Sequence, residues 1–204
     1  MAGRRKEEDA RNKLIDSYIK FIDLVQPEIL FFENVRGFTI GFKQGNKRGE
    51  AYSVYVVNKL KELGYAVKGE IVDFSEYGVP QKRQRYILVG TKKDNADKFF
   101  NLLIQNRADF FKSKELDKDT TSLSDAISDL LQSNGTEQSP DTKNFKAGLY
   151  TKATTSYQKL MRQDKNLAIQ IPNSHRFANH KKETVEKFQY ILAFGRANKN
   201  ISDE

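Results

Sequence analysis

Two short segments carry side chains whose types and spacing could do chemistry. The first holds Glu33 and Asn34, which directly follow the uninterrupted apolar run 29–32. Ligands of open α/β sheets bind at the carboxyl ends of the strands, so a carboxylate that emerges there is a candidate acid or base. A strand-end carboxylate paired with an arginine is the structural alternative, and position alone favours it.

The second segment is the basic turn 81–85, which leads into another apolar run. If the whole segment lies on a strand, Gln81, Arg83 and Arg85 project to one face because side chains alternate along a strand. Three such donors on one face suit a phosphate or a base edge. The alternative is an exposed basic edge that discourages pairing with another strand.

The elements that position these segments follow from hydrophobic spacing. Apolar residues recur at helical spacing over 14–25, and Pro27 ends that helix. The run 29–32 is typical of a strand covered on both faces in a parallel sheet. After a loop over 37–50, a second helix reaches Leu63, with Gly64 at the capping position. Residues 66–74 and 85–91 then predict two strands, so the order of elements indicates an α/β sheet with few strands.

Beyond Lys92 the pattern is weaker. We expect helices at 99–104, 123–131 and 181–194, a charged loop at 112–121, and a polar, mobile stretch at 132–143. The region from 143 to 199 carries 12 Lys and Arg against three acids, so the basic excess lies in the C-terminal third. Clustered positive charge favours nucleic acid, and a solvated lysine-rich surface is the alternative.

Composition excludes several classes of protein. The 204 residues carry a net charge of +8 and contain no cysteine, which excludes a disulfide scaffold, a thiolate metal site and a cysteine nucleophile within this chain. His175 and His180 lack further ligands at suitable spacing, so we expect no metal site. The apolar runs are too short to span a membrane, and the first residues lack a signal peptide, so we expect a soluble, cytoplasmic protein without membrane partners.

The two chemical segments, taken in order, resemble the DNA (cytosine-5) methyltransferase family. Residues 33–35 match its Glu-Asn-Val motif, and residues 81–85 match its Gln-x-Arg-x-Arg motif, with a helix between them as in that family. Residues 3–14 resemble the segment that follows the family's catalytic loop. Residues 123–131, 157–162 and 179–181 resemble the stretch that leads toward target recognition.

The resemblance implies a role for each matched residue. Glu33 would protonate or hydrogen-bond N3 of a flipped cytosine, and Asn34 would help to fix its setting. Arg85 would contact cytosine O2 and steady Glu33, while Arg83 and Gln81 would support the catalytic loop and a nearby phosphate. Leu14, with the backbone of Asn12, would line the pocket for S-adenosylmethionine. From the basic C-terminal third we add candidate contacts to double-stranded DNA, namely Lys159, Arg162, Arg176, Lys181 and Lys182.

The resemblance also implies a partial fold. We expect residues 1–95 to form the C-terminal half of a Rossmann-like methyltransferase sheet, and residues 96–204 to form a less ordered, mainly helical basic segment leading toward target recognition. In the family a glycine-rich cofactor loop and a Pro-Cys-Gln nucleophile loop precede these segments, and neither is found here.

We therefore expect a fragment or split-enzyme subunit of a bacterial restriction–modification methyltransferase, located at the nucleoid. It would be inactive without a partner chain that supplies the cysteine and the cofactor loop. A catalytically dead DNA-binding remnant is the alternative.

Overall fold

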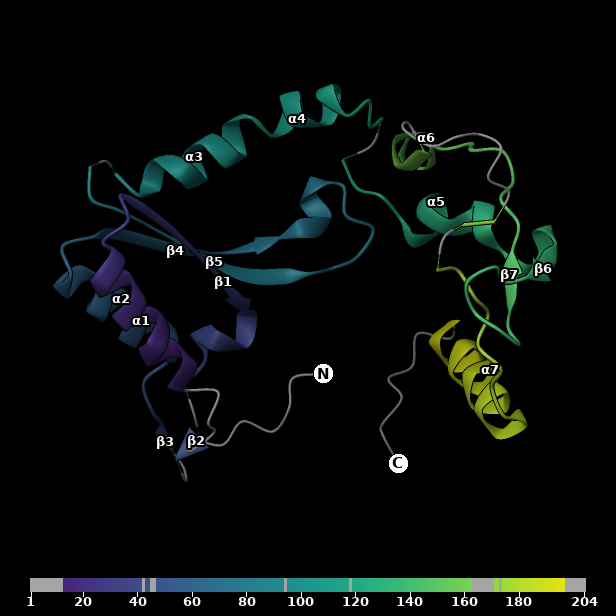
Figure 1. Ribbon diagram of the computed structural model, residues 1–204, viewed down its shortest axis with the longest axis horizontal. Coiled ribbons are helices and arrows are strands. Elements are labelled where there is room, and N and C mark those ends of the chain that lie inside the picture. The colour runs from purple at the N-terminus through teal and green to yellow at the C-terminus, as the bar shows by residue number, and fades with distance from the viewer. Residues whose placement is uncertain are drawn as a thin grey trace. The chain divides into compact units, whose positions relative to one another are not determined.

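The computed structural model describes residues 13–41, 43–44, 47–93, 95–117, 119–162, 171–172 and 174–196. The chain divides into two compact units, unit 1 up to Ala126 and unit 2 from Ile127 onward (Figure 1). The two matched motifs lie in unit 1, and the candidate DNA contacts of the basic third lie in unit 2.

Unit 1 is built on a three-stranded sheet. The strands β1 (Ile29–Val35), β4 (Ala66–Asp73) and β5 (Gln84–Thr91) lie in the order β1-β5-β4. Strand β5 is antiparallel to both neighbours. The α/β class is thus confirmed, whereas the parallel pairing expected for the run 29–32 is wrong, because β5 returns between the two strands that share a direction.

Helices cover both faces of this sheet (Figure 1). Helices α1 (Lys13–Val25) and α2 (Tyr52–Glu62) lie on one face, where Ile22, Val56 and Leu60 pack against Leu30 and Leu88. Helix α3 (Asp97–Gln105) covers part of the other face, where Phe100 packs against Ile87 and Val89. The bounds of α1, α2, β4 and β5 agree with the sequence expectations to within one residue.

Strand β1 is only partly covered, although its sequence is apolar on both sides. Leu30 is 4% exposed, but Ile29 is 69% exposed and Phe31 is 56% exposed. The expectation of a strand covered on both faces is therefore wrong for the described residues. An uninterrupted apolar run indicates that both faces of a strand are suited to burial. Whether they are buried depends on segments elsewhere in the sequence that pack against them.

Shorter elements complete unit 1. They are η2 (Arg36–Thr39), β2 (Lys43–Gln44), β3 (Lys47–Arg48), η3 (Phe74–Tyr77), α4 (Arg107–Ser113) and α5 (Leu123–Ile127), of which α5 ends one residue into unit 2. Strands β2 and β3 pair as a hairpin inside the predicted loop 37–50. Helix α4 extends into the start of the segment expected to be a charged loop.

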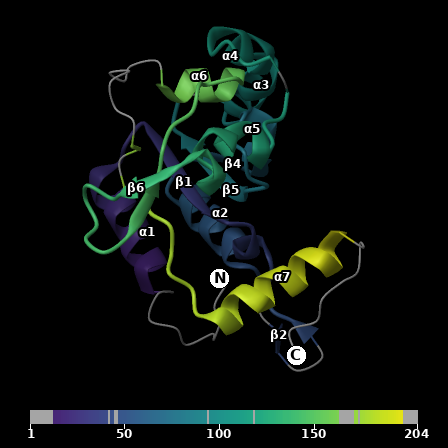
Figure 2. The same ribbon diagram turned by 90° about the vertical axis from the view of Figure 1, so that its right-hand side faces the viewer.

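The described part of unit 2 contains a small hairpin and several short helical segments, with α7 as its longest helix (Figure 2). Its elements are η4 (Ser128–Leu130), η5 (Gln132–Asn134), β6 (Thr136–Gln138), β7 (Lys146–Gly148), α6 (Ser156–Arg162) and α7 (Lys182–Arg196). The stretch 132–143, expected to be mobile, instead contains η5 and β6, and β6 pairs with β7. The partner strand lies beyond the polar stretch, so composition within the stretch could not reveal the pairing.

A buried glutamine holds the start of unit 2 together. Gln158 is 1% exposed, its side-chain oxygen accepts from the Thr154 N–H at 2.9 Å, and its side-chain nitrogen donates to Ser128 Oγ at 2.9 Å. A buried side-chain amide that has both a donor and an acceptor as partners holds two segments against each other. Here these segments are η4 and the start of α6. No helix among the described residues is long and apolar enough to cross a membrane.

Candidate active site and nucleic-acid interface

The structure brings the two chemical segments together at a single ion pair. Arg85 Nε and Glu33 Oε1 form an ion pair at 2.7 Å. The Arg85 side chain is 18% exposed and the Glu33 side chain 47% exposed, so the carboxylate is open to solvent while the guanidinium is mostly covered. An ion pair with a half-exposed carboxylate contributes little to stability, so its importance here is that it brings the two side chains together.

The register of the sheet explains why these two side chains meet. Val35 lies opposite Arg85 and Glu33 lies opposite Ile87, so Glu33 and Arg85 are diagonal neighbours on one sheet face. Arg85 Nη1 also donates to the backbone oxygen of Gln84 at 3.0 Å, which fixes the plane of the guanidinium. The structural alternative, a carboxylate at the end of a strand paired with an arginine, is therefore observed. The arginine that pairs with Glu33 is Arg85, the last residue of the second motif.

Asn34 is turned back on its own backbone. Its side-chain oxygen accepts from the Val35 N–H at 2.8 Å. This short-range contact fixes the end of β1 next to Glu33, and a role for Asn34 in setting Glu33 stays a proposal.

Gln81 and Arg83 precede the strand instead of lying on it. Strand β5 begins at Gln84, and both Gln81 and Arg83 are exposed. The expectation that strand alternation puts them on the same face as Arg85 is therefore wrong. They belong to a turn that begins with η3 and passes through Gly78, whose φ of 82° is in the left-handed region that favours glycine.

A group of residues that the sequence analysis did not single out shapes this turn. Asp73 accepts hydrogen bonds from Ser75, and Gln84 links Asp73 to Arg36 at the end of β1. The only sequence signal is a polar residue at each end of the turn, which is common in turns of every function.

The predicted cofactor contacts are not assembled among the described residues. Leu14 is 67% exposed on α1, and Asn12 lies outside the described residues. These residues do not fit a complete site for S-adenosylmethionine, because one exposed apolar side chain offers no polar group for its charged and hydroxyl-bearing parts.

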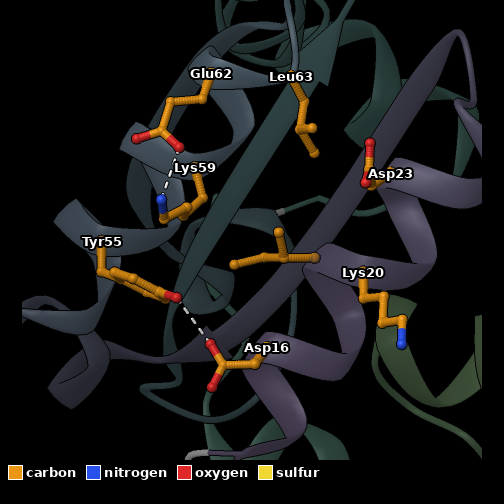
Figure 3. Close-up of a pocket in the computed structure, with 8 residues that line it drawn as sticks. Asp16, Lys20, Asp23, Tyr55, Lys59, Glu62 and Leu63 are labelled. Atoms are coloured by element: carbon orange, nitrogen blue, oxygen red, sulfur yellow. Dashed lines mark hydrogen bonds and ion pairs between the residues drawn. The ribbon is translucent and has the colours of Figure 1, made fainter.

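A pocket does lie between α1 and α2, but it contains none of the predicted site residues (Figure 3). The apolar side chains of Ile19 and Leu63 meet a charged rim there, where the Tyr55 hydroxyl donates to Asp16 at 2.9 Å. That hydrogen bond raises the pKa of Tyr55. In the same rim Lys59 pairs with Glu62 at 2.7 Å, a contact between neighbouring charges that is common on helix surfaces.

Arg162, a candidate DNA contact, points into unit 2. Its Nη2 pairs with Asp129, its Nη1 donates to the Thr151 backbone oxygen at 2.7 Å, and its guanidinium stacks over the Tyr150 ring at 4.0 Å. Burial lowers the pKa of Arg162, and Asp129 is only 4% exposed. In this position the guanidinium ties α6 to η4, so its geometry is that of a structural residue.

The other basic candidates are exposed. Lys159 lies on α6, while Lys181 and Lys182 lie at the start of α7. Arg176 is also exposed and stacks over Phe145 at 4.6 Å, which holds its charge near the β6–β7 hairpin. Among the described residues no group of His, Cys, Asp and Glu could hold a metal ion.

Comparison with known proteins identifies the family. The family model for C-5 cytosine-specific DNA methylases matches residues 1–202. The type II methyltransferase M.DdeI of Desulfomicrobium norvegicum is 28% identical over 204 residues, which is all of this chain and 44% of the relative. M.BspRI of Lysinibacillus sphaericus is 38% identical over 94 residues, which is 46% of this chain and 20% of the relative.

This chain belongs to the C-5 cytosine-specific DNA methylase family. The family resemblance read from the two motifs is therefore confirmed. The chain spans less than half the length of the curated relatives that it matches.

Proposed function

We propose that this chain forms part of a DNA cytosine-5 methyltransferase, which transfers a methyl group from S-adenosylmethionine to C5 of cytosine in double-stranded DNA. The observation that carries the proposal is the 2.7 Å contact between Glu33 and Arg85, on a solvent-open carboxylate, in a chain of this family. Both partners occupy the positions of the family's two motifs.

The chemistry explains why an acid and an arginine are needed side by side. Carbon C5 of cytosine becomes nucleophilic only when a nucleophile adds to C6 and the electron density that moves onto N3 is met by a proton. For this step Glu33 must be in its acid form and share its proton with N3, and its half-exposed carboxyl leaves room for a base extruded from the duplex. Arg85 holds the Glu33 carboxyl in place and directs its remaining donor capacity to cytosine O2.

The nucleophile must come from another segment, because these 204 residues include no cysteine. We propose a partner chain that carries the Pro-Cys-Gln loop and the glycine-rich cofactor loop. The uncovered part of β1 supports this: its described partner lies on one side only, and Ile29 and Phe31 are exposed. Exposed apolar strands at a sheet edge are surfaces that proteins cover with other segments. Alone, the chain would transfer no methyl groups.

The test is reconstitution. The chain is mixed with a candidate partner that bears Pro-Cys-Gln, with labelled S-adenosylmethionine and with cytosine-containing duplex DNA, and label in the DNA is measured. We expect label only in the complete mixture, reduced about a hundredfold by Glu33→Gln. The matched control is Glu28→Gln, which removes an exposed carboxylate paired with Lys93 near the other end of β1. A folded complex without methyl transfer would overturn the proposal.

A DNA-binding module without catalysis is the second candidate, and the exposed basic residues of unit 2 favour it. Lys159, Arg176, Lys181 and Lys182 could neutralise phosphates. This reading requires duplex binding by the chain that weakens steeply with salt, together with no methyl transfer in any reconstituted mixture. Duplex binding that does not depend on salt, or no duplex binding at all, would exclude this second candidate function.

A further inference from the structure

The turn between β4 and β5 carries Arg83 and leads into Arg85, which pairs with Glu33. Residues 78–83 of this turn lie outside helices and strands. Backbone contacts close only part of it: the Phe74 N–H donates to the Arg83 oxygen at 3.1 Å, the Val79 N–H donates to the Phe74 oxygen at 3.3 Å, and the Gln81 N–H donates to the Val79 oxygen at 2.7 Å. A turn of this length needs further contacts to hold one geometry.

The side chain of Asp73 supplies those contacts. Its Oδ1 accepts from the Ser75 N–H at 3.0 Å and from Ser75 Oγ at 2.8 Å, which caps the start of η3. Its Oδ2 accepts from Gln84 Nε2 at 3.4 Å. The hydrogen bonds from Ser75, followed by those from Gln84 and the Arg83 backbone, lower the pKa of Asp73. One carboxylate thus contacts both ends of the turn.

The chain of contacts continues to the Glu-Asn-Val segment. Gln84 Oε1 accepts from Arg36 Nη1 at 2.9 Å, and Arg36 directly follows the last residue of β1. The ends of all three strands are therefore tied together beside the Glu33–Arg85 pair. Of the side chains that tie them, Gln84 occupies a variable position of the second motif, and Asp73 and Arg36 lie outside both motifs.

We propose that Asp73 is a positioning residue: through Ser75, Gln84 and Arg36 it fixes the turn that carries Arg83 and supports the start of β5, where the register of the sheet places Arg85 against Glu33. The catalytic part of this inference rests on the proposed function, whereas the structural part does not. Asp73 touches no substrate, and its effect is transmitted through the turn.

The structural part is tested in the full 204-residue chain by amide hydrogen exchange followed by NMR. In Asp73→Ala the Ser75 and Arg83 amides should exchange faster by about fivefold, the factor that corresponds to a typical lost cap. Asp73→Asn should restore slow exchange at Ser75, because its side-chain oxygen can still accept there. Asp97→Ala, which removes the partner of Lys68 on α3, is the matched control and should leave both amides unchanged. Unchanged exchange in Asp73→Ala would overturn the proposal.

The catalytic part is tested in the reconstituted enzyme, with rates divided by the folded fraction. We expect Asp73→Ala to lower kcat about tenfold or more while KM for DNA changes little, since a displaced arginine costs most in the chemical step. Asp73→Asn should recover most of that loss. Faster exchange in Asp73→Ala with an unchanged kcat would refute the positioning role. If no mixture transfers methyl groups, the proposed function fails, and the exchange result still decides whether Asp73 holds the turn.

Discussion

Replacing Arg85 by lysine keeps the positive charge and removes the geometry, so it isolates what the guanidinium does. Two different nitrogens of Arg85 are engaged: Nε with Glu33 at 2.7 Å and Nη1 with the Gln84 backbone oxygen at 3.0 Å. A lysine has a single ammonium nitrogen at the end of a flexible chain, and it cannot reproduce both contacts from a fixed plane.

The magnitude follows from what is lost. The hydrogen bond that the charged Nη1 donates to the Gln84 oxygen is of a kind that contributes about 1.5–3 kcal/mol. Because Glu33 is 47% exposed, its ion pair adds little to this, and we take the lower end, about 1.5 kcal/mol, for the completed site. Since about 1.4 kcal/mol corresponds to a factor of ten, Arg85→Lys should lower kcat about tenfold from this contact alone. Loss of the contact to cytosine O2 would add to that factor.

The assay is methyl transfer by the reconstituted enzyme at saturating DNA, with urea unfolding of the chain measured in parallel. The matched control is Arg107→Lys, which makes the same change at an arginine that stacks over Tyr77 and Phe111. The double variant with Glu33→Gln should lose less than the sum of the two single losses, because the side chains act through one contact. Full turnover in Arg85→Lys would refute the assignment of Arg85.

Three further predictions concern the fold. Gly90→Ala should destabilise unit 1 by about 1–3 kcal/mol in urea unfolding, because its Cβ would lie 2.9 Å from Cγ of the buried Leu30. Arg162→Met should destabilise unit 2 by about 3 kcal/mol, because it leaves Asp129, which is 4% exposed, without its charged partner. Asp141 should stabilise the folded chain only above acid pH. Hydrogen bonds from Ser139 and from the Ser174 backbone lower the pKa of Asp141 from 3.8, so this contribution is present above that value and lost as pH falls through the lowered pKa.

Each of the three has its own control. Gly64→Ala, whose Cβ meets nothing within 4 Å, separates the clash at Gly90 from backbone strain, since Gly64 has a φ of 84°. Lys159→Met removes an exposed charge from the same helix as Arg162, and equal destabilisation by both would contradict the internal role of Arg162. Acid unfolding of Asp141→Asn should lack the acid-dependent loss, and a curve identical to that of the unchanged chain would contradict the assignment.

Local patterns in the sequence were sufficient for most elements of unit 1. Helical spacing of apolar residues located α1 and α2, and runs rich in β-branched and aromatic residues located β4 and β5. Gly64, which has a positive φ, marked the end of α2. The order of Glu33 and Arg85, with a helix between them, was sufficient to predict the family. These features are carried by neighbouring residues, whose spacing is fixed by the geometry of a helix or a strand.

Pairing and burial could not be read in the same way. The apolar run 29–32 is equally compatible with a parallel and an antiparallel neighbour, and only the return of β5 between β1 and β4 decided between them. The β6–β7 hairpin was missed because each strand is only three residues long and neither contains a β-branched or aromatic run, β6 being Thr-Glu-Gln and β7 Lys-Ala-Gly. The side chain of Arg162 points into unit 2 because it pairs with Asp129, which is more than thirty positions away in the sequence. The residues around Arg162 therefore give no sign of this contact.

The sequence by itself determined the chemical types at the site: an acid after an apolar strand, arginines before another, a basic C-terminal third and no cysteine. The tertiary structure decided that Glu33 and Arg85 touch, that Gln81 and Arg83 lie on a turn, and that Asp73, Gln84 and Arg36 hold this turn to the end of β1. The physical reason is that residue type and spacing are local properties. The register of β1 on β5, which makes the ion pair diagonal, is set by the packing of the whole sheet between its helices.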